Sequence, residues 1–241
     1  MSRASPGAAE RGNVFWYIMV AIVLFAALSY AVSQSNRGSV AAMSEEQARL
    51  AATEILDYAS ALSTATAQLR LRGFKDTEVS YENPVVAGYA NPSCTDAACR
   101  IFSPDGGGVA YKAPVTEWLD SSHTADPGYG AWVFSGDNEV DRVGTDGSTA
   151  ANKELIAFLP YVKKTLCLEL NRKTGMTNPS DAPPREADQI AAYTALFGGT
   201  YTHGESLTLP DPDKGKNAGC FEGGGNPPLG TYHFYQVLMA R

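Results

Sequence analysis

The sequence predicts an α+β fold in which a long N-terminal helix precedes an antiparallel sheet with additional helices. Three observations lead to this fold class. A strongly apolar segment occupies residues 14–32. Small and apolar residues then recur with helical spacing. Short alternating segments follow, separated by Gly and Pro. We therefore divide the chain into a leader, an apolar helix, an amphipathic helix and an α+β domain, at residues 1–12, 13–35, 36–73 and 74–241.

The composition is that of an ordinary globular protein. The chain has 241 residues, of which 44% are hydrophobic and 19% are charged, and its formal net charge is −7. The part that follows the apolar segment, about 200 residues, is long enough for one domain with its own core. Lys and Arg are scattered along the chain, so the charge pattern indicates no nucleic-acid partner.

The apolar segment has the length and composition of a membrane-spanning helix. Residues 14–32 contain no charged residue, proline or glycine, and a helix of this length spans roughly 28 Å, close to the thickness of the bilayer hydrocarbon. A buried helix of a soluble core would usually be apolar on one face only. Aromatic residues stand near both ends, as is typical of membrane interfaces: Phe15, Trp16, Tyr17 and Tyr30. A single-pass anchor over residues 13–35 is therefore predicted.

The basic residues around this anchor predict its direction. Arg3 and Arg11 precede the apolar segment, whereas Arg37 follows it. Because Lys and Arg are enriched on the cytoplasmic side of membrane anchors, the N-terminus is expected in the cytoplasm. Residues 74–241 are then expected outside it.

The cysteines support the same direction. All four follow the anchor, and an even number fits two disulfides in an oxidising compartment: Cys94, Cys99, Cys167 and Cys220. We expect the first two to close a small loop and the last two to tie a late loop to a helix. The alternative is a zinc site in which Cys94 and Cys99 form one pair of ligands.

A second helix is predicted within residues 36–73. Ser44 and Gln47 form a capping-box pattern, and Gly73 provides an end signal. Between them a 4-3 spacing of small or apolar residues defines one face: Ala48, Ala52, Ile55, Ala59, Leu62, Thr66 and Leu69. We expect this face to pack on the protein's own sheet, since a coiled-coil partner would require larger residues than these alanines.

The remaining segments are assigned by alternation, apolar spacing and turn residues. Residues 198–230, which are rich in Gly, Pro and Asp, are expected to be mostly loop. The last strand is expected to be central in the sheet. Strands are predicted at residues 100–102, 109–112, 131–134, 140–143 and 231–239, and helices at residues 152–159, 160–175 and 186–197.

Catalytic and metal motifs are absent from the sequence. The histidines, His123, His203 and His233, belong to no H-E-x-x-H pattern, and no G-x-S-x-G occurs. We therefore expect neither an enzyme nor a cofactor, and we expect His233 to pack in the last strand or lie on the surface. Asp211, Asp213 and Asn217 are similar to the start of a calcium loop. However, the glycine is misplaced and the closing glutamate is missing, so a solvated turn is the favoured interpretation.

The N-terminus resembles a known class of signal peptide. A short polar leader ends in Arg11-Gly12, and Asn13 opens the apolar helix directly. This arrangement resembles the class III signal peptide of type IV prepilins and pseudopilins. The resemblance implies cleavage by a prepilin peptidase between Gly12 and Asn13. It also implies a helix that first anchors the protein in the bacterial inner membrane and later forms a filament core.

The resemblance implies a structural subunit, either a minor pilin or a pseudopilin. Its expected partners are membrane lipid, the prepilin peptidase, and other pilin-like subunits or further copies of itself. The chain departs from the family at two positions. Most pilins begin the mature chain with Phe or Met and carry Glu at mature position five, whereas here these positions hold Asn13 and Tyr17. The alternative is a signal-anchored periplasmic binding or scaffold protein that does not polymerise.

Overall fold

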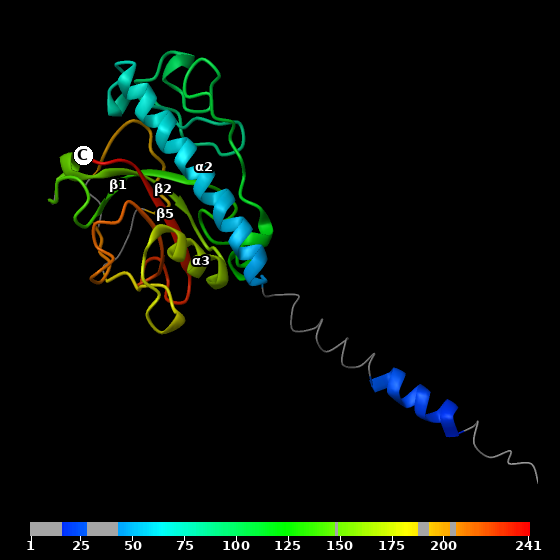
Figure 1. Cartoon of the computed structure of the whole chain (residues 1–241). Helices are drawn as coiled ribbons and strands as arrows, with labels where there is room; N and C mark the ends of the chain where they lie inside the picture. Colours follow the sequence, from blue (N-terminus) through cyan, green and yellow to red (C-terminus); the bar gives the residue numbers. More distant parts are fainter. Residues whose placement is uncertain (1–15, 28–42, 148, 188–192, 203–205) are drawn as a thin grey trace, which may run out of the picture. The chain divides into compact units, whose positions relative to one another are not determined.

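The structure of the protein is a computed structural model that describes residues 16–27, 43–147, 149–187, 193–202 and 206–241. The chain divides into two compact units, Met1–Ala42 and Met43–Arg241. In the first unit, residues 16–27 are helical. The second unit is a mixed α+β domain built around a five-stranded sheet (Figure 1). This arrangement confirms the predicted α+β class for the folded domain.

Helix α2 (Glu45–Leu71) opens the domain, and its N-terminus carries the predicted capping box. The Ser44 hydroxyl accepts a hydrogen bond from the backbone N–H of Gln47 (3.2 Å). The Gln47 side chain accepts one from the Ser44 N–H (3.1 Å). At the other end, Gly73 has a φ of +98°, which ends the helix at low cost because glycine lacks a Cβ. The predicted amphipathic helix is thus confirmed from residue 45 onward, while residues 36–42 lie outside the described part.

The strands form a single sheet in the order β3-β1-β2-β5-β4. Three of its pairs, β1–β2, β2–β5 and β4–β5, are antiparallel, whereas β1–β3 is parallel. The last strand therefore pairs on both sides, as predicted, although β2 occupies the middle. The strand bounds are Val133–Val140 (β1), Glu154–Leu159 (β2), Ser206–Leu207 (β3), Ala218–Glu222 (β4) and Tyr232–Met239 (β5).

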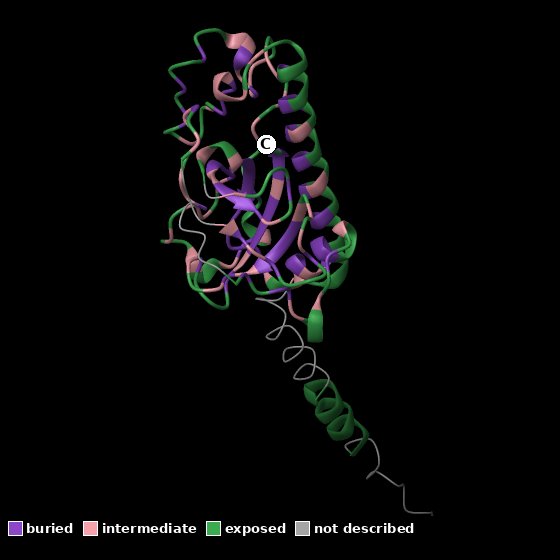
Figure 2. Ribbon diagram, turned by 90° about the vertical axis from the view of Figure 1, so that its left-hand side faces the viewer, coloured by how far each residue is buried: buried purple, intermediate pink, exposed green. Residues whose placement is uncertain are grey.

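Both faces of this sheet are buried, and each face has its own cluster of apolar residues. On one face, α2 and α3 (Lys164–Thr174) pack against Leu155, Ala157 and Phe234. Ile156 and Phe158 point to the opposite face, which loops cover. Figure 2 shows the buried positions of α2 on the side turned to the sheet and its exposed positions on the other. All seven residues of the predicted α2 stripe are buried. Complete burial of an aliphatic side chain such as Leu62 contributes roughly 1.5–3 kcal/mol.

The helix predicted at residues 152–159 is wrong, because residues 154–159 form strand β2. All six strand residues are buried between β1 and β5. A strand that is covered on both faces shows a continuous apolar run without alternation. A short run of this kind cannot be distinguished from a helical segment by periodicity.

The helix predicted at residues 160–175 begins later than expected. At the start of the predicted segment, the backbone N–H groups bond to other parts of the chain. The Val162 N–H donates to the Tyr232 carbonyl (2.9 Å), and the Lys163 N–H donates to the Trp118 carbonyl (2.8 Å). The helix itself is α3, and it ends as predicted at Gly175, a left-handed cap with a φ of +73°.

The helix predicted at residues 186–197 is also wrong where the structure describes it. Residues 188–192 lie outside the described part, and the flanking residues are not helical. The Ala187 N–H donates to the Thr208 carbonyl (2.9 Å), and the Phe197 N–H donates to the Phe134 carbonyl (2.8 Å). Distant segments therefore take the hydrogen bonds that a helix would have used.

The strand predictions failed in three places. The segments at residues 131–134 and 140–143 are replaced by the single strand β1, which has an irregular register between Ser135 and Asn138. The segment at residues 100–102 forms only one bridge, from Arg100 to Ser80, and residues 109–112 belong to no strand. Conversely, the expected loop at residues 198–230 contains β3 and β4. Short 3₁₀ turns occur at Asp76–Glu78, Ala97–Cys99, Thr116–Trp118, Ser121–His123, Ala150–Asn152 and Pro179–Asp181.

The packing of α2 makes a direct prediction about stability. Leu62→Ala removes a completely buried side chain and should lower the free energy of unfolding by about 2–5 kcal/mol. Leu71→Ala on the same helix should change it by less than about 0.5 kcal/mol, because Leu71 is 88% exposed. Urea unfolding of the oxidised full-length chain in detergent measures both values. Equal losses would mean that α2 does not pack through this stripe.

Candidate functional site

The N-terminal helix is apolar around its whole circumference. Residues 16–27 read Trp-Tyr-Ile-Met-Val-Ala-Ile-Val-Leu-Phe-Ala-Ala, without a charged residue. Large side chains are exposed on every side of the helix, from Trp16 (71%) to Phe25 (75%). Leaving an aliphatic or Phe side chain in water forgoes roughly 1.5–3 kcal/mol each. A helix of this kind requires lipid or another protein surface around it.

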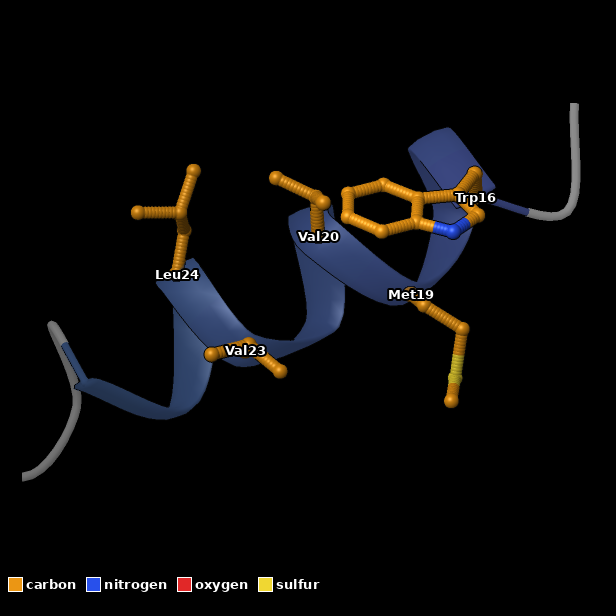
Figure 3. Close-up of a pocket in the computed structure, with 5 residues that line it drawn as sticks. All are labelled: Trp16, Met19, Val20, Val23 and Leu24. Atoms are coloured by element: carbon orange, nitrogen blue, oxygen red, sulfur yellow. The ribbon is translucent and has the colours of Figure 1, made fainter. Parts of the chain in front are cut away.

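One side of this helix carries a continuous apolar row. Trp16, Val20 and Leu24 follow one another at a spacing of four residues, and Met19 and Val23 lie beside them (Figure 3). Together these five residues line a shallow hollow of about 460 Å³. Residues three and four apart lie on the same side of a helix, so this row presents a surface on which another apolar helix can pack.

Several predictions for the N-terminal region fall outside the described residues. Gly12 and Asn13, the predicted cleavage site, are among them, and so are both ends of the predicted anchor at residues 13–35. Within the part of the chain that the structure describes, no helix is both long and apolar enough to cross a membrane. Tyr17, which stands where most pilins have glutamate, lies in the described helix and is exposed.

The cysteines pair as predicted. Cys94 is bonded to Cys99 within a short loop, and Cys167 on α3 is bonded to Cys220 on β4. Both sulfurs of the second bond lie in the core beneath α2. The Asn171 side chain supports the same junction, because it accepts a hydrogen bond from the Cys220 N–H and donates one to the Cys220 carbonyl, both at 2.8 Å. Since every cysteine is bonded to another, none is available for the alternative zinc site.

The residues of the possible calcium loop have protein partners. The Asp213 carboxylate is buried and accepts hydrogen bonds from the backbone and hydroxyl of Thr177. Asp211 pairs with Arg142 (3.1 Å), and the Asn217 carbonyl accepts from the Val237 N–H (2.7 Å). Among the described residues, no group of three or more His, Cys, Asp or Glu side chains could hold a metal ion. Calcium binding stays the weaker of the two sequence-based alternatives for this loop, behind the solvated turn.

Two of the histidines lie close to one aromatic cluster. His233 is completely buried and contacts Tyr161, Tyr193 and Phe221, while its Nε2 lies 2.7 Å from the Thr231 hydroxyl. Burial lowers the pKa of His233 to about 3, so the ring stays neutral. His123 stacks on the Tyr161 ring, and its Nδ1 lies 2.7 Å from the Asp126 carboxylate. His203 lies outside the described residues.

A buried group of charged side chains crosses the β1–β2 pair. The Lys153 ammonium lies 3.0 Å from the Glu139 carboxylate, and these side chains are 1% and 8% exposed. The loop that follows β1 joins the group, since the Gly147 N–H donates to Glu139 (2.9 Å) and the Gly147 carbonyl accepts from Lys153 (3.4 Å). The lysine charge is therefore compensated inside the fold, and it ties the loop to the sheet.

Glu154 is buried beside this ion pair with incomplete compensation. One carboxylate oxygen accepts a hydrogen bond from the Val140 N–H (2.8 Å), but the other has no partner among the described residues. The side-chain oxygen of Asn138, its register partner on β1, is also unpartnered there. Burial raises the pKa of Glu154 to about 7, because desolvation penalises the charged form. The sequence analysis missed this group, because it placed Glu154 in a predicted helix at residues 152–159 and not in a buried strand.

Comparisons of the chain with models of known protein families, with curated protein sequences and with solved structures give no match. Its role is therefore inferred from its own residues.

Removing the second disulfide should destabilise the domain more than removing the first. Cys167 and Cys220 are 53 residues apart, which in the loop-entropy account corresponds to about 4 kcal/mol of stabilisation. For Cys94 and Cys99, five residues apart, the corresponding value is about 2 kcal/mol. Double Cys→Ala variants of each pair, compared by urea unfolding, measure the difference. A larger loss for the Cys94–Cys99 pair, or any free thiol in the denatured unreduced protein, would contradict the assignment.

Glu154 should make the domain less stable as the pH rises. Its folded pKa of about 7 exceeds the ordinary value of 4.5, so the folded state binds the proton more tightly. The stabilisation from this group is complete below about pH 4.5 and is lost as the pH rises through about 7. In Glu154→Gln this loss is absent, and at pH 8 the variant should be more stable than the parent by about 3 kcal/mol.

Unfolding curves between pH 4 and pH 8 test this, with Glu117→Gln as the matched control at an exposed carboxylate. Parallel pH profiles for the parent and Glu154→Gln would show that Glu154 titrates normally in the folded state.

Proposed function

We propose that this chain is a pilin-like structural subunit, a minor pilin or pseudopilin, of a bacterial envelope filament or secretion system. In this proposal a single helix over residues 13–35 anchors it in the inner membrane. The N-terminus faces the cytoplasm, and residues 74–241 face the periplasm or the exterior. Its partners are membrane lipid, a prepilin peptidase, and other pilin-like subunits or further copies of itself.

The observation that carries the proposal is the all-round apolar surface of residues 16–27. A helix with one apolar row could be covered by the protein's own domain. This one exposes Tyr17, Ile18 and Met19, which are consecutive residues and therefore point in three different directions around the helix axis. Lipid can cover all of these directions at once, and so can a ring of neighbouring helices. A pilin subunit uses both environments in succession, first as a membrane anchor and then as part of a filament core.

The rest of the chain is compatible with such a subunit. An amphipathic helix, α2, follows the apolar segment and packs on its own sheet, so the domain buries its core without a partner. The Cys167–Cys220 bond fixes a late strand to α3, which suits a domain exposed to an oxidising compartment. In this mechanism the folded domain takes no direct part in assembly. Assembly occurs when the apolar helix exchanges its contacts with lipid for contacts with the helices of neighbouring subunits.

A second candidate is a signal-anchored periplasmic binding or scaffold protein that does not polymerise. The observation that favours it is Tyr17, whose exposed phenol replaces the glutamate of most pilins. A phenol lacks the negative charge of a carboxylate and cannot attract the positive N-terminus of a neighbouring subunit in the same way. Within the first proposal, the same substitution points to a minor subunit rather than the major one.

Processing distinguishes the two candidates. When the full-length chain is expressed with a prepilin peptidase, mass spectrometry should find a mature N-terminus at Asn13. Gly12→Leu should block the cleavage, because the glycine precedes the scissile bond. Gly7→Leu, in the same leader, should be cleaved like the parent.

An intact terminus at Met1 or Ser2 in the presence of an active peptidase would favour the signal-anchored protein. Cleavage elsewhere in the leader would remove the resemblance on which the pilin assignment depends.

A further inference from the structure

The segment at residues 109–113 follows α2 without belonging to any strand. Figure 1 shows this green segment running beside the helix. Its ends are attached on opposite sides: the Val109 N–H donates to the Ile101 carbonyl (3.3 Å), and the Lys112 N–H donates to the Tyr58 hydroxyl on α2 (3.1 Å). Among the described residues, the backbone N–H and C=O of Ala110 have no hydrogen-bond partner. In an extended chain, residues two apart present their backbone N–H and C=O groups to the same side. Those of Ala110 therefore point toward α2, as the Lys112 N–H does.

A groove separates this segment from α2 and has the size of a ligand site. Its volume is about 670 Å³, within the range typical of binding pockets. The groove is lined by apolar surface and a few charged side chains. On the α2 wall, Leu50 contributes an exposed apolar side chain. The lining residues are Leu50, Thr53, Glu54, Asp57, Tyr58 and Ala61 from α2, and Gly108, Val109, Ala110 and Lys112 from the facing segment.

The floor of the groove is held rigidly by Tyr58. Its ring lies 5.4 Å from that of the buried Trp132, and its hydroxyl fixes the backbone of Lys112. Burial raises the pKa of Tyr58 to about 12, so the hydroxyl stays protonated. The neighbouring cavity, which Tyr58 lines together with Ile55 and Trp118, has a volume of only about 20 Å³, so the ring has little space to move into. A preformed site of this kind binds a partner without first having to order itself.

The charges in the groove favour a cationic partner. Glu54 and Asp57 stand one helical turn apart on the exposed side of α2, and neither forms an ion pair with a described residue. Lys112 is the one cation in the lining, and it lies over the Tyr58 ring, 5.9 Å from its centre. The three side chains leave a net negative charge. A basic side chain placed between the two carboxylates would be paired there.

We propose that this groove binds an extended, basic segment of another protein, which adds as a strand beside residues 109–112. The free N–H and C=O of Ala110 would bond to the backbone of the incoming segment. Glu54 and Asp57 would hold its basic side chain, and Leu50 with Val109 would cover its apolar ones. The site lies wholly within the folded domain, so it does not depend on cleavage at Gly12 or on polymerisation.

The test uses the full-length oxidised chain in detergent and labelled pentapeptides. The first probe is Val-Lys-Val-Arg-Val. The second is the acidic peptide Val-Glu-Val-Glu-Val, and the third is the basic peptide with methylated backbone nitrogens. Fluorescence anisotropy should show saturable binding of the basic peptide and binding about tenfold or more weaker for the other two. Hydrogen exchange should slow at Ala110 when the basic peptide is bound.

The matched variants are Glu54→Gln/Asp57→Asn in the groove and Glu45→Gln/Glu46→Gln on the first turn of the same helix. All four positions are exposed, so both variants should retain the parent melting temperature. The groove variant should bind the basic peptide about tenfold more weakly, and the control should bind it like the parent. The proposal is overturned by an absence of saturable binding, by equal binding of the acidic or methylated peptide, or by equal affinities of the two variants.

Discussion

Strand β2 must be covered on both faces, because none of its six residues reaches solvent. This requirement accounts for most of the architecture. One face receives α2 and α3, and the other receives the loops that precede and follow the short strands. The alanines at positions 52 and 59 of α2 allow the helix to approach closely. The Cys167–Cys220 bond joins α3 to β4, which is an edge strand of the sheet.

The burial of β2 also removes three charged side chains near its start from water: Lys153, Glu154 and Glu139. Lys153 and Glu139 form an ion pair, so their charges compensate one another. The desolvation cost of Glu154 is only partly offset, because one of its carboxylate oxygens has no hydrogen-bond partner among the described residues. A buried ion pair adds little net stability, but an alternative strand register that separates the two charges is strongly destabilised. If β1 slipped by one residue, Glu139 would move to the other face of the sheet and Lys153 would remain unpaired. The pair therefore selects the register of the two strands despite the irregularity after Ser135.

The elements that were predictable are those whose signals are local. The capping box of α2, its stripe, the glycine after α3 and the aromatic and apolar run of β5 are each signals that a short stretch of sequence carries. Strand β2 and the segment at residues 186–197 were misassigned because distant partners, such as the Phe134 carbonyl, decide their hydrogen bonding. For the candidate site, the apolar helix and the cysteine pairs follow from the sequence. The buried Glu154 and the unpaired edge at Ala110 do not, since both depend on which segment comes to lie opposite.

The position of α2 determines how the domain responds to tension. A force applied at Met43 enters along the axis of helix α2, which packs against β5 and α3. Such a force loads these contacts in shear, so they must slide together rather than separate one after another. The rate of forced unfolding depends on the unfolding barrier rather than on equilibrium stability. A domain built in this way can be mechanically durable even where its thermodynamic stability is ordinary.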